Sequence, residues 1–383
     1  MQEKDSKYIF GVVKGMALAK MRRHWIDNLR WVTVLLVLLY HVIYFYNNKG
    51  VIGGMGGFGE GPQYQDVVMY ILYPWFMPLL FILAGISAKY ALDRRSPREW
   101  FKMRTRKLLV PSTIGLFFIG AAIGRINTMI SPAVDTIESL PFGIKYMIWA
   151  LSGTGPLWFI QDLWLFSIVL LIVRKLDSKG RFMTLCSHAG MTSVILMGLL
   201  FWLGHQTLIM KPDPASAEGL WNLYKPIFYL IPFLMGYFVF SHDRVQDDLG
   251  RSWIPLMLSS SVSGVVLTMT GFGQDNTLPQ YLCSPLNNIY GWLMCLAMMG
   301  WFKTSFNKTG AFSSYMSRSS YGIYIVHYLV IATIGYFLKA KTQMPPACIY
   351  IVLTIAVFTL SPLIYEVLKR IPFIRWCVLG EKK

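Results

Sequence analysis

The sequence predicts an all-α integral membrane protein, a bundle of about ten transmembrane helices with both termini in the cytoplasm. Composition supports this fold class. Of the 383 residues, 55% are hydrophobic and only 14% are charged, whereas about a quarter of a soluble chain is charged. The mean hydropathy is +0.47. Most of the chain is therefore expected to lie in a lipid bilayer, which is its first predicted partner.

Ten segments have about the 20 residues that a helix needs to cross a bilayer. In chain order they are residues 26–46, 67–91, 109–129, 156–173, 184–204, 223–240, 254–271, 284–302, 320–338 and 347–367. The first segment has no small-residue cleavage pattern, so we expect it to remain as a membrane anchor. Residues 130–155 are interrupted by Pro132, Pro141 and "SGTGP". This stretch is expected to cap the outer face or to re-enter the membrane.

The distribution of basic residues predicts the orientation. The net charge is +17, and 27 of the 36 Lys and Arg residues fall on the predicted cytoplasmic side against four in the outer loops. The positive-inside rule then places both termini in the cytoplasm. Because the basic residues form short clusters between apolar runs, they do not indicate nucleic acid as a partner.

The same pass along the chain divides it into three parts. Residues 1–20 are expected to form a cytoplasmic or interfacial leader, residues 21–370 the transmembrane domain, and residues 371–383 a basic cytoplasmic tail. Five cysteines are scattered without a Cys-x-x-Cys pair, so neither a disulfide framework nor a metal site is predicted.

Ionisable residues inside predicted spans are the first candidates for function, because they are costly in lipid. They are Asp27, Arg30, His41, Lys89, Arg125, Asp162, His327 and Glu366. Three of these, Asp27, Lys89 and Glu366, lie at inner edges, where snorkelling or pairing at the interface explains them without a catalytic role.

His41, Asp162 and Arg125 fall in the outer third of the predicted bilayer. A histidine next to a carboxylate at that depth can act as a general base, with the acid orienting the ring and stabilising the imidazolium. The alternative is a satisfied polar network that holds helices together. Spacing alone leaves both interpretations open.

Arg30 and His41 are eleven positions apart in the first span, which is almost three helical turns. They therefore share one face and lie roughly 16 Å apart along the axis. This predicts a lane for an elongated ligand, with an anionic head at Arg30 and a reactive end at His41. The basic segment "MRTRKLLVP" places Arg104, Arg106 and Lys107 where they can hold a polyphosphate at the inner mouth, although part of its charge serves topology.

These residues resemble the integral-membrane acyltransferase 3 family over residues 21–370. Its arginine, ten residues, then histidine motif corresponds to Arg30 and His41 in "RWVTVLLVLLYH". The segments "MPLLFILAGISA", "MRTRKLLVP", "GPLWFIQDLW" and "SSYGIYIVHY" are similar to further family segments, in family order. The basic segment of the family has two arginines three apart, where this chain has Arg104 and Lys107. Ala84 replaces a common serine, which argues against a nucleophile at that position.

The resemblance implies an enzyme of the bacterial cytoplasmic membrane. It would transfer an acyl group, of acetyl or succinyl type, from acyl-coenzyme A to a hydroxyl of an extracytoplasmic carbohydrate or related envelope acceptor. His41 would be catalytic and Arg30 its partner on the donor path, and acyl-coenzyme A would be a substrate with no permanently bound cofactor. The other implied site residues are Asp162 as a second catalytic group, Arg104, Arg106 and Lys107 for the donor, and Asp27, Arg125, Trp158, Gln161, Tyr324 and His327 as lining.

Several alternatives stay open. Direct transfer and a transient acyl-histidine both fit His41. A transporter or flippase without acyl chemistry would also place charges inside the membrane, but we see no internal repeat of the kind such proteins carry. An inactive relative that only binds acyl-coenzyme A is a third interpretation, and the oligomeric state is not predicted.

Overall fold

A computed structural model describes residues 23–47, 54–59, 61–131, 133–208, 225–274 and 279–381. Within these ranges the chain consists of helices and their connections, without a β-strand. The all-α prediction is therefore confirmed for the described part of the chain. The predicted leader, residues 1–20, lies outside the described residues.

A helix stands at every one of the ten predicted spans, but not all of them are long and apolar enough to cross a membrane. Among the described residues six helical stretches pass that test. They are α2 (His24–Tyr44), Tyr64–Leu92 with α3 (Val67–Leu72) and α4 (Phe76–Leu92), Gly155–Leu176 with α10 (Trp158–Leu176), α16 (Asp243–Gly271), α19 (Ala311–Lys341) and α20 (Pro346–Arg370).

Two further predicted spans are bent pairs of helices, which raises the number of candidate spans to eight at most. One pair joins Pro97–Phe117 to α7 (Ile119–Met129) at 50°, and the other joins α11 (Arg181–Ser187) to Met191–Gln206 at 111°. The two predicted spans that remain are residues 223–240 and 284–302. They correspond to α15 (Pro226–Phe238), which is short, and to α18 (Pro285–Ser305), which has polar residues near both ends. The count of ten spans and the cytoplasmic termini are thus not confirmed.

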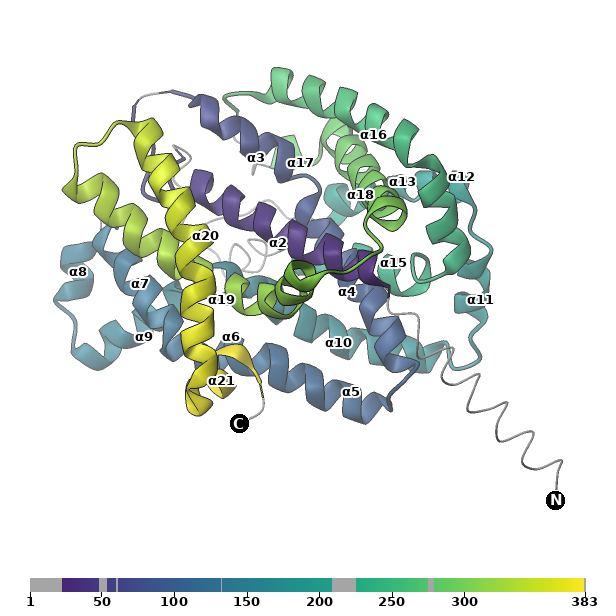
Figure 1. Cartoon of the computed structure of the whole chain (residues 1–383), viewed down its shortest axis with the longest axis horizontal. Helices are drawn as coiled ribbons and strands as arrows, with labels where there is room; N and C mark the ends of the chain where they lie inside the picture. Colours follow the sequence, from purple (N-terminus) through teal and green to yellow (C-terminus); the bar gives the residue numbers. More distant parts are fainter. Residues whose placement is uncertain are drawn as a thin grey trace.

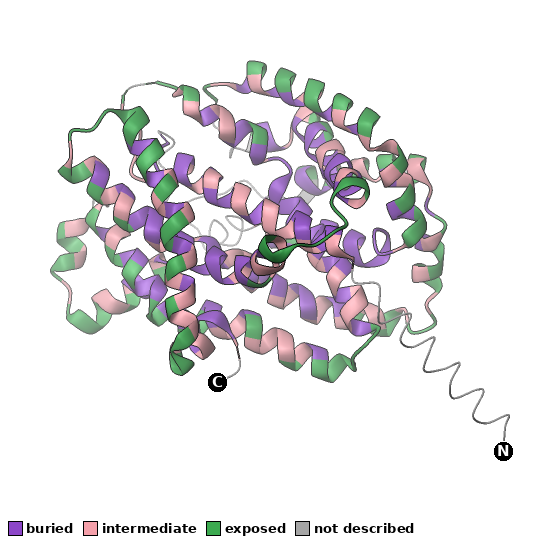
Figure 2. Ribbon diagram, viewed as in Figure 1, coloured by how far each residue is buried: buried purple, intermediate pink, exposed green. Residues whose placement is uncertain are grey.

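Helix α2 lies in the middle of the bundle and contacts helices from both halves of the chain (Figure 1). It packs against α19, α18, α4 and α20, while α16 packs against α18 and α7 against α9 (Phe142–Ser152). Figure 2 shows that α16 and α20 form part of the outside. Their exposed apolar side chains include Leu258, Val262, Met269, Ile351, Ile355 and Leu363. Such continuous apolar surface suits contact with lipid.

Helices α4 and α15 cross at very short range, because each has a glycine at the crossing. A methyl group on Gly85 would lie 2.0 Å from the Phe233 carbonyl oxygen, and one on Gly236 would lie 2.2 Å from the Ile82 carbonyl oxygen. Small residues allow this approach in membrane helix pairs. The crossing fixes the part of α4 that carries Ser87, a residue of the site described below.

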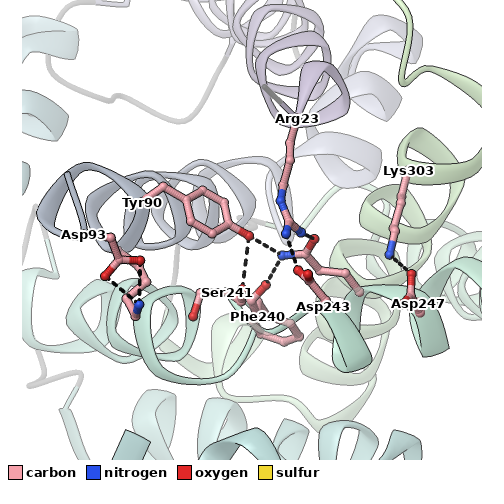
Figure 3. A network of polar contacts seen from close by, with 10 residues as sticks. Arg23, Tyr90, Asp93, Phe240, Ser241, Asp243, Asp247 and Lys303 are labelled. Carbon is pink, nitrogen blue, oxygen red and sulfur yellow. Dashed lines mark hydrogen bonds and ion pairs between the residues drawn. The ribbon is translucent and has the colours of Figure 1, made fainter. Parts of the chain in front are cut away.

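A polar network holds the start of α2 against α4 and α16 (Figure 3). Arg23 contacts both Asp243 and Gln246, and the Gln246 amide donates to the Tyr90 hydroxyl at 2.9 Å. Tyr90 donates in turn to the Ser241 carbonyl oxygen at 3.1 Å. Because these partners come from three helices and one connection, the network sets where α2 enters the bundle.

The predicted C-terminal tail is packed rather than free over its described part. Residues Pro372–Leu379 form α21, and Cys377, Val378 and Leu379 are buried. A methyl group on Gly380 would lie 2.6 Å from the Arg106 carbonyl oxygen. The described end of the chain therefore packs against the backbone of the basic segment at Arg106.

Candidate active site

The centre of the site is a pair of histidines from α2 and α19. The His41 Nδ1 atom lies 3.0 Å from His327 Nε2, and His327 Nδ1 lies 2.6 Å from the Tyr324 carbonyl oxygen. A carbonyl oxygen only accepts, so His327 Nδ1 carries the proton and its Nε2 carries a lone pair. His41 Nδ1 must then be the donor to His327. This assignment leaves the lone pair of His41 on Nε2.

The two rings differ in exposure and are held by aromatic neighbours. His327 is fully buried, whereas His41 is partly exposed. The rings of Tyr40, Tyr44 and Tyr328 surround His41 at centroid distances of 5.4, 6.1 and 5.5 Å. The His41 ring is therefore fixed on one side by a hydrogen bond and on its flanks by packing.

One face of α19 connects the histidine pair to the basic segment. Tyr321, Tyr324 and His327 follow one another at three-residue intervals, which keeps them near one face of a helix. The Tyr321 hydroxyl donates to the Lys107 carbonyl oxygen, the Tyr324 hydroxyl donates to the Pro156 carbonyl oxygen, and His327 meets His41. This face positions three regions that are far apart in the sequence.

At the other end of α2, Arg30 is held by two helices. Its Nη2 atom donates to Ser87 Oγ on α4 at 2.6 Å, and its Nη1 atom lies 3.2 Å from Asp27 Oδ1. Ser87 donates to the Leu83 carbonyl oxygen at 2.6 Å. These contacts orient the Arg30 side chain and leave it about one third exposed.

The basic segment has an unusual backbone. It follows α5 (Pro97–Arg104) and takes one π-helical turn over Thr105–Leu109, a feature that is frequent at functional sites. Arg104 donates through Nε to Ser167 Oγ at 3.2 Å and stacks over the Trp100 ring. The Arg30 and Arg104 side chains both lie close enough to Lys107 for their charges to interact.

Some donors of this segment have no partner in the described structure. The Nη2 atom of Arg104 and the Nε atom of Arg106 are buried without a hydrogen bond to any described residue. Buried donors are nearly always satisfied in folded proteins, and guanidinium groups bind phosphate oxygens well. Together with Arg30, these side chains form a basic cluster suited to an anionic ligand.

Asp162 lies near this centre but not on His41. It is buried on α10, within electrostatic range of the hydroxyl groups of Tyr229 and Tyr324. Within the described part of the chain no hydrogen bond joins Asp162 to His41, and Asp162 Oδ2 is buried without a partner. The partner of His41 that the structure shows is His327, which the sequence suggested only as a lining residue.

The remaining predicted residues fall in two groups. Trp158 packs on Tyr229 at 5.4 Å between ring centroids, and the Gln161 amide donates to the Ser112 carbonyl oxygen at 3.1 Å, so both lie beside Asp162 on α10. Arg125 is exposed and stacks over Trp149 at 5.0 Å, between α7 and α9. The contacts of Arg125 do not include the histidine pair.

The predicted lane along α2 is closed in this structure. Val34, Val37 and Leu38 lie between Arg30 and His41 on that side of the helix, and all three are buried. A long ligand can follow this face only if neighbouring helices move apart, or it must pass beside it. The lane along α2 stays a prediction, and sequence spacing alone does not show which helix covers that face.

Comparison with known proteins decides the family. The family model Acyl_transf_3, an acyltransferase domain, matches residues 23–366. The chain belongs to this acyltransferase family. No curated protein and no solved structure matches the chain. The resemblance stated from the sequence motifs is confirmed, and with several helices long and apolar enough to span a bilayer, the chain is a multi-pass membrane acyltransferase.

Sequence reasoning missed two features of this acyltransferase. It did not pair His327 with His41, although the "SSYGIYIVHY" spacing marked one face of α19. It also did not find Ser87 as the partner of Arg30, for which the only signal was a hydroxyl at the end of the apolar run of α4.

Proposed function

We propose that this membrane acyltransferase uses His41 as a general base to move an acyl group of acetyl or succinyl type from acyl-coenzyme A to a hydroxyl of a carbohydrate or related envelope acceptor. In this proposal the enzyme works in the bacterial cytoplasmic membrane, with the donor on the cytoplasmic side and the acceptor outside. The observation that carries it is the contact of His41 Nδ1 with His327 Nε2 at 3.0 Å, beside that of His327 Nδ1 with the Tyr324 carbonyl oxygen at 2.6 Å. The tautomers inferred from these two contacts leave a lone pair on His41 Nε2.

The transfer follows from that lone pair. His41 Nε2 takes the proton of the acceptor hydroxyl as its oxygen attacks the thioester carbonyl carbon. The tetrahedral intermediate collapses, the C–S bond breaks, and the sulfur leaves with the proton from the His41 imidazolium. During this step the positive charge on His41 strengthens its Nδ1–H bond to His327, whose own proton points at the Tyr324 carbonyl oxygen. His327 thus holds the base in one orientation.

The basic cluster would bind the acyl-coenzyme A substrate. Arg30, Arg104, Arg106 and Lys107 would bind the phosphate groups of coenzyme A, and the buried unpartnered nitrogens of Arg104 and Arg106 are the donors that such oxygens would satisfy. Arg30 and His41 lie roughly 16 Å apart along α2. The extended arm of coenzyme A would bridge this distance, which requires the side chains around Val34 and Val37 to separate or the arm to take a neighbouring path.

The test is acyl transfer by the purified full chain in lipid nanodiscs. Radiolabelled acetyl- or succinyl-coenzyme A is supplied with candidate oligosaccharide acceptors, and both free coenzyme A and labelled acceptor are measured. His41→Ala should lower transfer roughly a thousandfold. His188→Ala, which changes an exposed histidine outside the site, should transfer at the wild-type rate.

Two results would contradict the proposal. Transfer that persists in His41→Ala at the wild-type rate would exclude His41 as the base. A wild-type protein that binds no acyl-coenzyme A would exclude this donor. Release of free coenzyme A also separates an enzyme from a transporter, which would move its substrate without breaking the thioester.

A further inference from the structure

A small open cavity lies two aromatic rings away from His41 and is not used by the mechanism above. Its volume is about 10 Å³, which is room for one water-sized group. Tyr73, His205, Lys225, Tyr229 and Asn287 contribute polar side chains to its lining. These residues come from four different parts of the chain, since Lys225 and Tyr229 both belong to the start of α15, so the fold has to bring them together.

Lys225 gives the cavity a positive charge. Its Nζ atom donates to the Tyr73 hydroxyl at 3.1 Å and lies 5.3 Å from the centre of that ring. Within the described residues no carboxylate lies at ion-pair distance from Lys225, although the side chain is half-buried. Lys225 also caps α15 with a left-handed backbone, φ +48°. The positive end of the α15 dipole therefore adds to the ammonium charge.

Asn287 adds an unsatisfied acceptor. Its side chain is 1% exposed, and Oδ1 has no hydrogen-bond partner among the described residues. Leaving such an oxygen buried and unpaired is costly. A donor from a ligand hydroxyl would satisfy it, so the cavity offers the Lys225 ammonium group, the Tyr73 hydroxyl and an acceptor that has no partner among the described residues.

Two chains of contacts connect the cavity to the catalytic centre. The Tyr73 ring stacks on Tyr40 at 5.9 Å, and Tyr40 packs against His41 at 5.4 Å. On the other side, the Tyr229 and Tyr324 hydroxyl groups both lie within electrostatic range of Asp162, and the Tyr324 carbonyl oxygen accepts from His327. A substrate group in this cavity would therefore be separated from the base by two aromatic rings, those of Tyr73 and Tyr40.

We infer that Lys225 and Tyr73 form an anion subsite that binds a carboxylate or phosphate group of a substrate while His41 acts on it, with Asn287 accepting from a neighbouring hydroxyl. This inference rests on the proposed function. The anion has two chemical sources, namely the distal carboxylate of a dicarboxylic acyl group or a charged group on the acceptor. One oxygen enters the cavity, and the rest of the ligand stays at its mouth. The subsite would select charged substrates over neutral ones.

The test compares charged and neutral substrates in pairs. In the acyl arm, kcat/KM is measured for succinyl- and acetyl-coenzyme A with a neutral acceptor. In the acceptor arm, acetyl-coenzyme A is used with a neutral oligosaccharide and with the same oligosaccharide bearing a carboxylate or phosphate. Each arm gives a ratio of charged to neutral kcat/KM for the wild type, Lys225→Gln, Lys225→Arg and Lys145→Gln.

In Lys225→Gln the ratio should fall about tenfold in the arm that contains the natural anion. Lys225→Arg keeps the charge and should recover most of it. Lys145→Gln changes a lysine that pairs with Glu138 on α8 (Val134–Glu138), and its ratio should equal that of the wild type. A ratio that Lys225→Gln leaves unchanged in both arms would overturn the subsite.

A second readout keeps the subsite testable if the proposed function fails. Succinate and inorganic phosphate are added separately to the purified protein, and the thermal unfolding midpoint is recorded. At least one ion should raise the midpoint of the wild type and of Lys145→Gln but not that of Lys225→Gln. If the wild type transfers no acyl group, this difference still supports the subsite. Equal shifts in the wild type and Lys225→Gln in that case would overturn it.

Discussion

The two ends of α2 are built on different principles. At His41 the polar atoms of the two rings form a directed chain, from His41 Nδ1 to His327 and from His327 to a backbone carbonyl oxygen. Near Arg30 the neighbouring Arg104 and Arg106 keep buried nitrogens without partners in the described structure. The contacts that orient the base are therefore formed without a ligand, whereas the basic cluster keeps buried donors without partners among the described residues.

This difference separates chemistry from binding. A base must already be oriented when the substrate arrives, because reorganisation during the reaction raises the barrier. A binding cluster for a multiply charged donor can instead leave donors unsatisfied, since the ligand completes them and the cost of the unpaired state favours binding. The comparison therefore predicts losses in kcat at the His41 end and losses in KM at the Arg30 end.

The largest effect is expected from His327. Replacing it by leucine in His327→Leu removes the acceptor for His41 Nδ1–H and should lower kcat roughly a hundredfold, because the ring loses its fixed tautomer and orientation. The KM for acyl-coenzyme A should hardly change. His327→Gln keeps an acceptor near the position of Nε2 and should retain more activity than His327→Leu.

A double variant of His41 and His327 provides a control for this prediction. The variant that combines His41→Ala with His327→Leu should be no slower than His41→Ala, since residues that act as a unit are not additive. A His327→Leu protein with near wild-type kcat would show that His41 does not depend on this hydrogen bond.

The next effect concerns the basic cluster. Arg104→Ala removes a cation whose buried Nη2 atom has no partner among the described residues, and it should raise the KM for acyl-coenzyme A about tenfold with little change in kcat. Added salt should raise the wild-type KM more steeply than that of the variant. Arg318→Ala, at an exposed position on α19, is the matched control. A fall in kcat at unchanged KM would place Arg104 at the chemical end instead.

A smaller effect on the same parameter is expected from Ser87. Ser87→Ala deletes the hydroxyl that accepts from Arg30 Nη2 at 2.6 Å, while Asp27 still orients the guanidinium. The KM for acyl-coenzyme A should rise roughly threefold. Ser263→Ala on the outer helix α16, where the hydroxyl is exposed, should have no effect. A loss in kcat from Ser87→Ala would contradict the division between the two ends.

The sequence was sufficient for features that depend on apolar length and local spacing. The first predicted span, residues 26–46, coincides closely with α2 (His24–Tyr44), and the shared side of Arg30 and His41 follows from helix geometry. The bends of 50° and 111° were not predictable, because they depend on packing between helices. The burial of Val34 and Val37 also depends on packing between helices, so the sequence did not predict it.

The site shows the same limit. His41 and His327 are 286 positions apart, and no local pattern reports which buried histidine meets which. The sequence suggested Asp162 as a second catalytic group because a carboxylate is the usual partner of a catalytic histidine, but it left open whether the two residues are in contact. Depth in the membrane was the only information on their distance, and depth does not fix position around the bundle.

A substitution of Asp162 gives the smallest predicted effect, and it is the sharpest test of which residue is the partner of His41. If a carboxylate oriented His41, Asp162→Asn would lower kcat about as much as His327→Leu. The structure instead places Asp162 among Tyr229 and Tyr324, with Oδ2 buried and unpartnered in the described residues. Asp162→Asn should therefore change kcat less than threefold, since it alters no contact of the base.

The stability of the same variant separates the two views further. A buried ionisable oxygen without a partner does not stabilise the fold, so the neutral amide, which keeps the shape of the side chain, should leave the thermal unfolding midpoint unchanged or raised. Measuring kcat and the midpoint together in nanodiscs decides the matter. A hundredfold loss of kcat with an unchanged midpoint would restore Asp162 as the catalytic partner and would make the histidine pair a structural contact.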